Sequence, residues 1–107
     1  MGKTIRFTIA LAMGIALTSV ASLAQSGGEA LYKAKCMTCH GAAGMADTNV
    51  GKALKVRPIS DPEVKKLSLS AQISVTKNGV GKMQGFKDKY TDAQIKEMVE
   101  YFRTFTK

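Results

Sequence analysis

Five consecutive residues, Cys36-Met37-Thr38-Cys39-His40, carry the most specific chemistry in this sequence. Two thiols three positions apart can each add to one of the two vinyl groups of a single haem, and the imidazole that follows can bind the iron. His40 is the only histidine in the chain. The pattern therefore predicts one covalently bound haem c per chain, attached through Cys36 and Cys39, with His40 as an axial iron ligand.

Two other interpretations of this motif are open. A redox disulfide is typical of Cys-x-x-Cys beside a βαβ unit, and the sequence predicts no such unit. A structural zinc ion usually takes four protein ligands, whereas Cys36, Cys39 and His40 supply three and the chain has no further Cys or His. Haem attachment is favoured over both.

The iron of such a haem needs a sixth ligand or has an open site, and no second histidine is available. Met37 lies inside the attachment motif, and Met45 is too close in sequence to reach the other face of the haem. Met98 lies on the apolar stripe of the last predicted helix, where a core role is the simpler interpretation. Met83 follows His40 by 43 residues in a glycine-rich loop. Met83 is therefore the predicted ligand, with space filling as its alternative role.

Helices separated by loops must position these residues. Ser26 and Glu29 predict a capping box at the start of a first helix that runs to Cys36, and small residues predict a loop over residues 41–51. Asp61 and Pro62 predict the start of a short second helix. Ser68 predicts the cap of a third.

The third helix is expected to end at Asn78-Gly79. Thr91 and Gln94 form a second capping-box pattern. After it, apolar residues recur at spacings of three and four, which predicts an amphipathic last helix. The expected class is all-α, since no run of alternating strand residues is found.

Three blocks of residues 25–107 resemble class I cytochrome c, and especially the small single-haem periplasmic cytochromes of bacteria. Gly28 and Tyr32 precede Cys36 by eight and four residues, where that family has a glycine and an aromatic residue. The attachment motif itself matches, and residues 78–86 resemble the family's methionine-ligand loop around Met83. Residues 98–101 resemble its last helix.

This resemblance implies a cytochrome c-like fold with three to five helices around one haem. The first and last helices would cross where Gly28 lets the backbones approach. The resemblance also implies that the Pro58 carbonyl accepts a hydrogen bond from His40, and that Lys52 or Arg57 pairs with a haem propionate.

The resemblance further implies electron transfer between redox proteins, with His40 and Met83 as the axial ligands. Catalysis is not expected, because two axial ligands leave no site on the iron for a substrate. Two alternatives remain. One is a haem c subunit of a dehydrogenase or oxidase complex in the periplasm, and the other is a gas-binding haem sensor.

Residues 1–24 have the three-part pattern of a secretory signal peptide. Lys3 and Arg6 precede an apolar run over residues 9–20, and small residues at Ser22 and Ala24 predict cleavage before Gln25. The alternative is an uncleaved anchor, although the run is short for a span of about 20 residues. A periplasmic domain over residues 25–107 is expected.

The 107-residue chain has a net charge of +8, with sixteen basic and eight acidic residues. Removing Lys3 and Arg6 leaves fourteen basic residues against eight acidic ones, a net +6. The basic residues are mostly scattered lysines without an Arg-rich tract, so nucleic acid is not an expected partner. A monomer that meets acidic protein surfaces, or weakly an anionic membrane, is expected.

Overall fold

The computed structural model describes residues 2, 14 and 21–106. The signal-peptide prediction falls on residues 1–24, of which all but 2, 14 and 21–24 lie outside the described part. Within that part, no helix is both long enough and apolar enough to cross a membrane.

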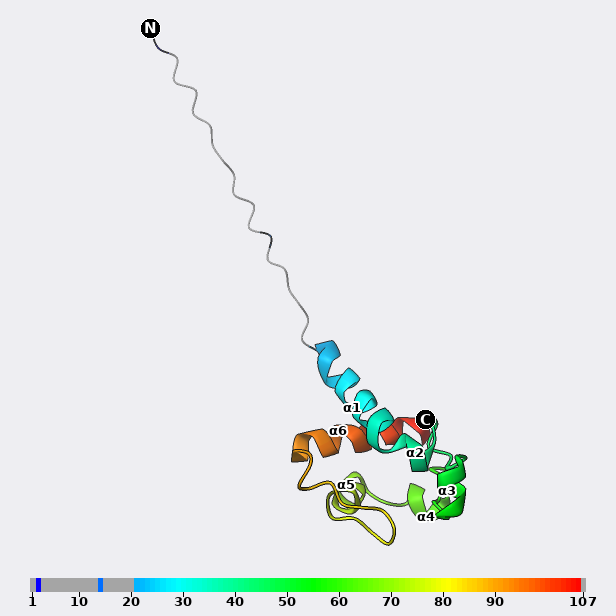
Figure 1. Cartoon of the computed structure of the whole chain (residues 1–107). Coiled ribbons are helices and arrows are strands. Elements are labelled where there is room, and N and C mark those ends of the chain that lie inside the picture. Colours follow the sequence, from blue (N-terminus) through cyan, green and yellow to red (C-terminus); the bar gives the residue numbers. More distant parts are fainter. Residues whose placement is uncertain (1, 3–13, 15–20, 107) are drawn as a thin grey trace.

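The described residues form six α-helices and one 3-10 turn (Figure 1). They are α1 (Ala21–Lys35), α2 (Met37–His40), α3 (Asn49–Ala53), α4 (Pro62–Lys65), α5 (Leu69–Asn78), α6 (Asp92–Arg103) and η1 (Thr104–Thr106). Only α1, α5 and α6 exceed five residues. The same part of the chain has no β-strand, and its one β-bridge joins Val80 to Met83. The predicted all-α class is confirmed.

Several helix boundaries follow the local capping signals. The Asp61 side chain accepts a hydrogen bond from the Glu63 amide at the start of α4. The Ser68 hydroxyl accepts one from the Ala71 amide at the start of α5. Thr91 and Gln94 form the expected capping box of α6. These side chains satisfy backbone amides that have no partner within the helix.

Two predicted boundaries are wrong. The first helix begins at Ala21, so Ser26 lies inside the helix and not at its N-cap position. Alanine and leucine in residues 21–24 favour helix strongly enough to extend it toward the N-terminus. The loop after Gly41 is shorter than expected, because Thr48 caps α3 by accepting a hydrogen bond from the Gly51 amide at 2.9 Å.

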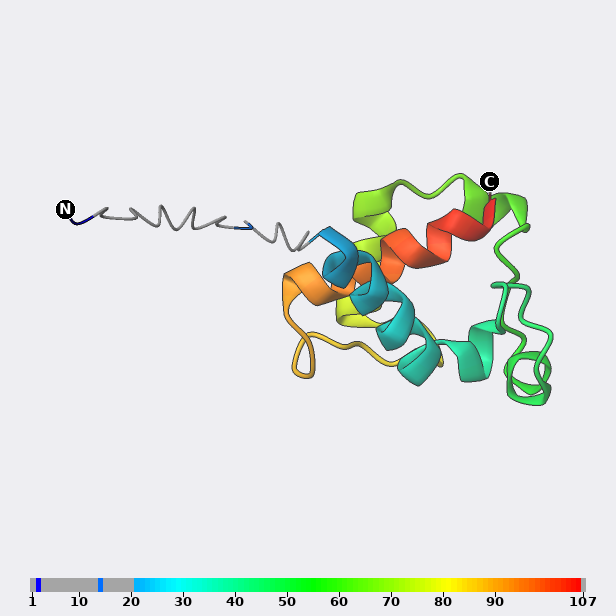
Figure 2. The same ribbon diagram turned by 90° about the horizontal axis from the view of Figure 1, so that it is seen from above.

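The first and last long helices, α1 and α6, cross in both ribbon views (Figures 1 and 2). The crossing requires Gly28, because a Cβ atom there would lie 2.5 Å from the Glu97 carbonyl oxygen. Real Cβ contacts are longer than this, so the missing side chain is what lets the two backbones meet. The expected crossing at Gly28 is confirmed.

Aromatic side chains fill the space between α1 and the end of α6. The ring centroid of Tyr32 lies 5.4 Å from those of both Tyr101 and Phe105, in tilted and edge-on arrangements. Tyr32 is buried, and its hydroxyl donates a 2.6 Å hydrogen bond to the Gly41 carbonyl. This bond joins α1 to the residue that directly follows the attachment motif.

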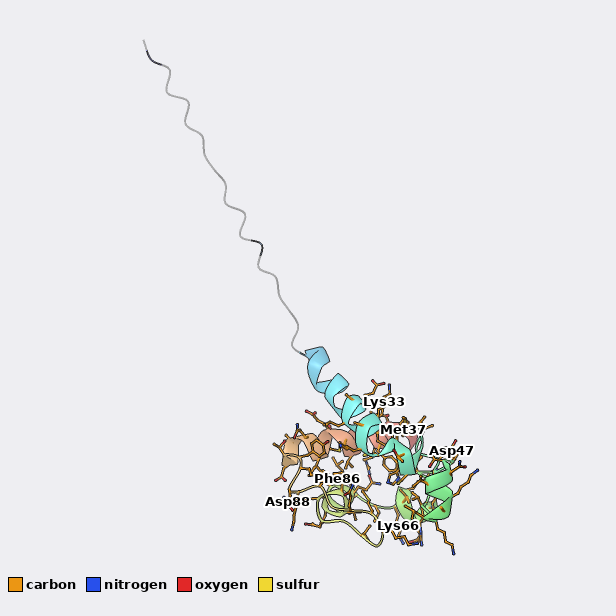
Figure 3. All side chains as sticks on the ribbon, viewed as in Figure 1. Lys33, Met37, Asp47, Lys66, Phe86 and Asp88 are labelled. Carbon is orange, nitrogen blue, oxygen red and sulfur yellow. The ribbon has the colours of Figure 1, made fainter. Side chains whose placement is uncertain are left out.

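The loop between α5 and α6 is anchored by Phe86, which is buried. Its amide donates to the Thr76 carbonyl at 3.0 Å, and the Lys87 amide donates to the Lys77 carbonyl at 3.1 Å. Figure 3 shows Phe86 beside α5, while Asp88 points outward from the same loop. One large apolar side chain and two backbone bonds thus hold the Met83 loop against α5.

Candidate haem-binding site

The attachment motif lies at the junction of α1 and α2. The Cys36 amide donates to the Tyr32 carbonyl at 2.8 Å, and the His40 amide donates to the Cys36 carbonyl at 2.9 Å. This helical spacing brings Cys36, Cys39 and His40 to the wall of one cavity. Both thiols are free and half-buried.

Burial shifts the ionisation of two of these groups. Burial, with a smaller contribution from Cys39, raises the pKa of the Cys36 thiol to about 11. Redox-active cysteines have lowered pKa values instead, so the disulfide-exchange interpretation is disfavoured. Burial lowers the pKa of His40, which favours the neutral imidazole that binds metals.

The cavity has a volume of about 880 Å³. Such a volume lies within the range of roughly 300–1,000 Å³ that is typical of ligand sites. The inner face of α6 contributes Met98, Val99 and Phe102, and α5 contributes Val75. The Phe102 ring lies 5.3 Å from the imidazole of His40 in an edge-on contact. The attachment motif thus faces a largely apolar wall.

Met83 reaches the cavity from the loop between α5 and α6. Its amide donates to the Val80 carbonyl at 2.9 Å, and its own carbonyl accepts from the Val80 amide at 3.0 Å. Gly79 and Gly81 have φ values of 82° and 54° in this tight turn, where other residues would be strained. The backbone at Met83 is therefore held in one place.

Two of the four candidate methionines line the cavity, Met83 and Met98. Met98 is only 1% exposed and lies on the buried face of α6, in the hydrophobic core, as predicted. Met45 is 46% exposed and does not line the cavity, and neither does Met37. Met83 is thus the cavity-lining methionine that comes from a loop.

Two contacts implied by the family resemblance differ from expectation. The Nδ1 atom of His40 is buried without a hydrogen-bond partner among the described residues. The Pro58 carbonyl instead accepts the Asp61 amide at 2.9 Å, since Pro58 begins the turn that leads into α4. Arg57 lines the cavity but Lys52 does not, because Lys52 lies within α3.

Lys55 is a cavity-lining residue that the sequence interpretation missed. No local motif identifies Lys55. The only signal was its position between Lys52 and Arg57, the two basic residues expected near a haem propionate. Together with Arg57 and Lys66 it places positive charge on a cavity that is otherwise mainly apolar. A haem has an apolar ring and two carboxylates, so the residues present fit this group.

Comparison with known proteins also indicates a c-type cytochrome. The family model described as cytochrome c oxidase, cbb3-type, subunit III matches residues 24–102. The solved structure titled KustC0563 c-type cytochrome is 35% identical, with a TM-score of 0.67, and the match covers 75% of this chain and 98% of that chain. A tyrosine-to-phenylalanine mutant of Kustc0563 is 33% identical, with coverage of 74% and 98% and a TM-score of 0.66. No curated protein matches the chain.

Proposed function

Because the chain belongs to the c-type cytochrome family of cbb3-type cytochrome c oxidase subunit III, we propose that it shuttles single electrons between redox partners outside the cytoplasm. As a family member it carries covalently bound haem c with its iron, which supplies one-electron chemistry. The observation that supports the proposal most is the convergence of Cys36, Cys39, His40 and Met83 on one cavity.

Each of these four residues has a proposed role. The Cys36 and Cys39 sulfurs form thioether bonds, one to each vinyl group of the haem. His40 and Met83 would bind the iron, and a methionine sulfur raises the reduction potential. With both residues bound, the iron would offer no site to a substrate, which supports electron transfer as the role of the chain in preference to catalysis.

The apolar wall has a separate role. Met98, Val99 and Phe102 exclude water from the iron, so that the charge on the haem changes in a medium of low polarity. The hydrogen-bonded backbone at Met83 would limit the movement of this ligand when the haem is oxidised or reduced. Small rearrangement on electron transfer favours a fast exchange with partners.

We further propose that the partners present acidic surfaces. Lys35 and Lys82 are exposed and line the cavity, which places positive charge at its mouth. Lys33 pairs instead with Glu29 at 2.6 Å, so it contributes less to this field. Export by a cleaved segment 1–24 and a monomeric state complete the proposal, with weak attraction to anionic membranes as a side effect.

The family description supports a second candidate, a haem c subunit held within an oxidase complex. The solved relative that the match covers to 98% is described as a c-type cytochrome, and that description fits either arrangement. Purification from the native source under mild conditions separates the two. A free shuttle elutes at the mass of a single small chain, whereas a subunit elutes with larger partners.

Covalent attachment is tested by extraction with acidic organic solvent. Haem should remain on the wild-type chain and be extracted from the Cys36→Ala, Cys39→Ala double variant, if that variant retains any haem. Release of all haem from the wild type would refute the attachment and, with it, the proposed roles of both cysteines.

Axial ligation is tested by comparing two methionine variants. Met83→Ala should lower the reduction potential, open the iron to carbon monoxide and remove the iron–sulfur absorption band. Met98→Leu changes the other cavity-lining methionine and should preserve all three properties. The assignment is wrong if the two variants exchange these outcomes.

Steering by charge is tested with electron-transfer rates against an acidic and a basic partner protein. Rising salt should slow the first reaction and accelerate the second, since the screening length shrinks to roughly 10 Å at 0.1 M. Lys82→Glu should weaken this contrast more than Lys96→Glu, because Lys96 is exposed on α6 and does not line the cavity. A flat salt response with both partners would rule out steering.

A further inference from the structure

Lys55 has an unusual backbone conformation, with a φ of 55°. L-residues other than glycine rarely adopt positive φ, because the Cβ atom then approaches the following carbonyl oxygen. Within the described part of the chain, only Ala46 shares this property among the non-glycine residues. Ala46 is buried and does not line the cavity, whereas Lys55 does.

The conformation belongs to the end of α3. The Lys55 amide donates to the Lys52 carbonyl at 3.1 Å, and the Val56 amide donates to the Gly51 carbonyl at 2.9 Å. These two bonds form a Schellman motif, in which the residue after the C-cap adopts the left-handed conformation. That residue is usually glycine, which has no Cβ penalty. Ending the helix therefore does not explain a lysine at this position.

The charges around Lys55 suggest what the side chain does. Glu63 is the only acidic residue among the described cavity-lining residues, and it is paired with Lys66. Among the residues that the structure describes, Lys55 and Arg57 have no acidic side chain within ion-pair distance. Both side chains are exposed to solvent, and no acidic side chain of the described chain competes for either cation.

We propose that Lys55 is kept in its strained conformation because its ammonium group pairs with a carboxylate of the bound haem and thereby raises the reduction potential. This inference rests on the proposed function, since it requires a haem in the cavity. The oxidised haem carries one more positive charge than the reduced haem. A nearby cation therefore destabilises the oxidised form, and it also offsets a carboxylate that would stabilise that form.

Four variants of the haem-loaded protein separate this role from helix termination. Lys55→Gly and Lys55→Asn remove the charge with residues that tolerate positive φ, and both should lower the midpoint potential by a similar shift. Lys55→Arg keeps the charge and should retain the wild-type potential. Lys52→Gln removes the same charge from within α3, away from the cavity lining, and should shift the potential much less.

High salt supplies an additional check. Since Lys55 is exposed at the cavity rim, the difference in potential between wild type and Lys55→Gly should shrink as the ionic strength rises. Folding is not at risk in Lys55→Gly, because glycine is the residue that the motif prefers.

Two results would contradict the proposed role of Lys55. If Lys55 only ends α3, the glycine variant will keep the wild-type potential, and the inference is then wrong. It is also wrong if Lys52→Gln lowers the potential as much as Lys55→Gly does. A wild-type chain without covalently bound haem would instead refute the proposed function. Equal potentials in fully haem-loaded proteins would refute the role of Lys55 alone.

Discussion

Gly28→Ala should destabilise the protein, whereas the same change one residue earlier, Gly27→Ala, should not. Both substitutions replace a helical glycine of α1, which gains roughly 0.5–1 kcal/mol in helix propensity. At Gly28 the new Cβ would lie 2.5 Å from the carbonyl oxygen of Glu97 and 3.0 Å from its carbonyl carbon. These are backbone atoms of α6, so α1 must move away from α6.

The cost of such overpacking is about 1–3 kcal/mol. The middle of this range exceeds the gain in helix propensity, so Gly28→Ala should lower the free energy of unfolding by about 1 kcal/mol. At Gly27 the new Cβ meets the Oε2 atom of Glu97 at 3.0 Å. That atom ends a flexible side chain and can swing aside, so the propensity gain remains.

Denaturant unfolding of the haem-loaded variants, followed by circular dichroism, measures both changes. A loss of 1 kcal/mol also lowers the melting temperature by roughly 4–8 °C in a domain of this size. The haem absorption spectrum serves as a control, since neither residue lines the cavity. If Gly28→Ala is as stable as Gly27→Ala, the close approach of α1 and α6 is not the reason for glycine at position 28.

Three further predictions concern single contacts and can be measured in the same unfolding assay. Tyr32→Phe should lose about 1–2 kcal/mol, because the buried Gly41 carbonyl loses its 2.6 Å donor. Thr91→Ala should lose about 1 kcal/mol by removing the cap of α6, and Thr91→Ser should recover most of it. Met98→Leu should cost less than about 1.5 kcal/mol, as a swap of similar volume in the core. A wild-type melting curve for Tyr32→Phe would mean that water replaces the tyrosine hydroxyl.

Local signals predicted the fold where the relevant physics is local. Ser68 and Thr91 cap their helices with side chains that bond to amides three residues away, so a short window of sequence contains the whole interaction. Ser26 has the same signature but lies inside α1, five residues after its first residue. Its failure depends on the helix-forming residues before it, because a capping residue matters only where the helix would otherwise stop.

Only part of the candidate site could be predicted from the sequence. The attachment motif is specified by spacing alone, so Cys36, Cys39 and His40 could be placed together from the sequence. Lys55 could not be found, because its position at the cavity depends on the left-handed turn that ends α3. The bond expected from His40 to the Pro58 carbonyl is not formed among the described residues. That carbonyl accepts the Asp61 amide in the turn before α4, and the Nδ1 atom of His40 is buried without a partner.

The cavity also explains why so short a chain attaches its cofactor covalently. Among the described residues, seven hydrophobic side chains are buried, and some of these, such as Met98 and Val99, also line the cavity of about 880 Å³. Without haem this apolar wall faces water, at a cost of roughly 25 cal/mol for each Å² left exposed. Small chains bury too little surface to tolerate such a loss. A haem in this cavity would therefore be part of the hydrophobic core, and the proposed thioether bonds from Cys36 and Cys39, at the junction of α1 and α2, would keep that part of the core from dissociating.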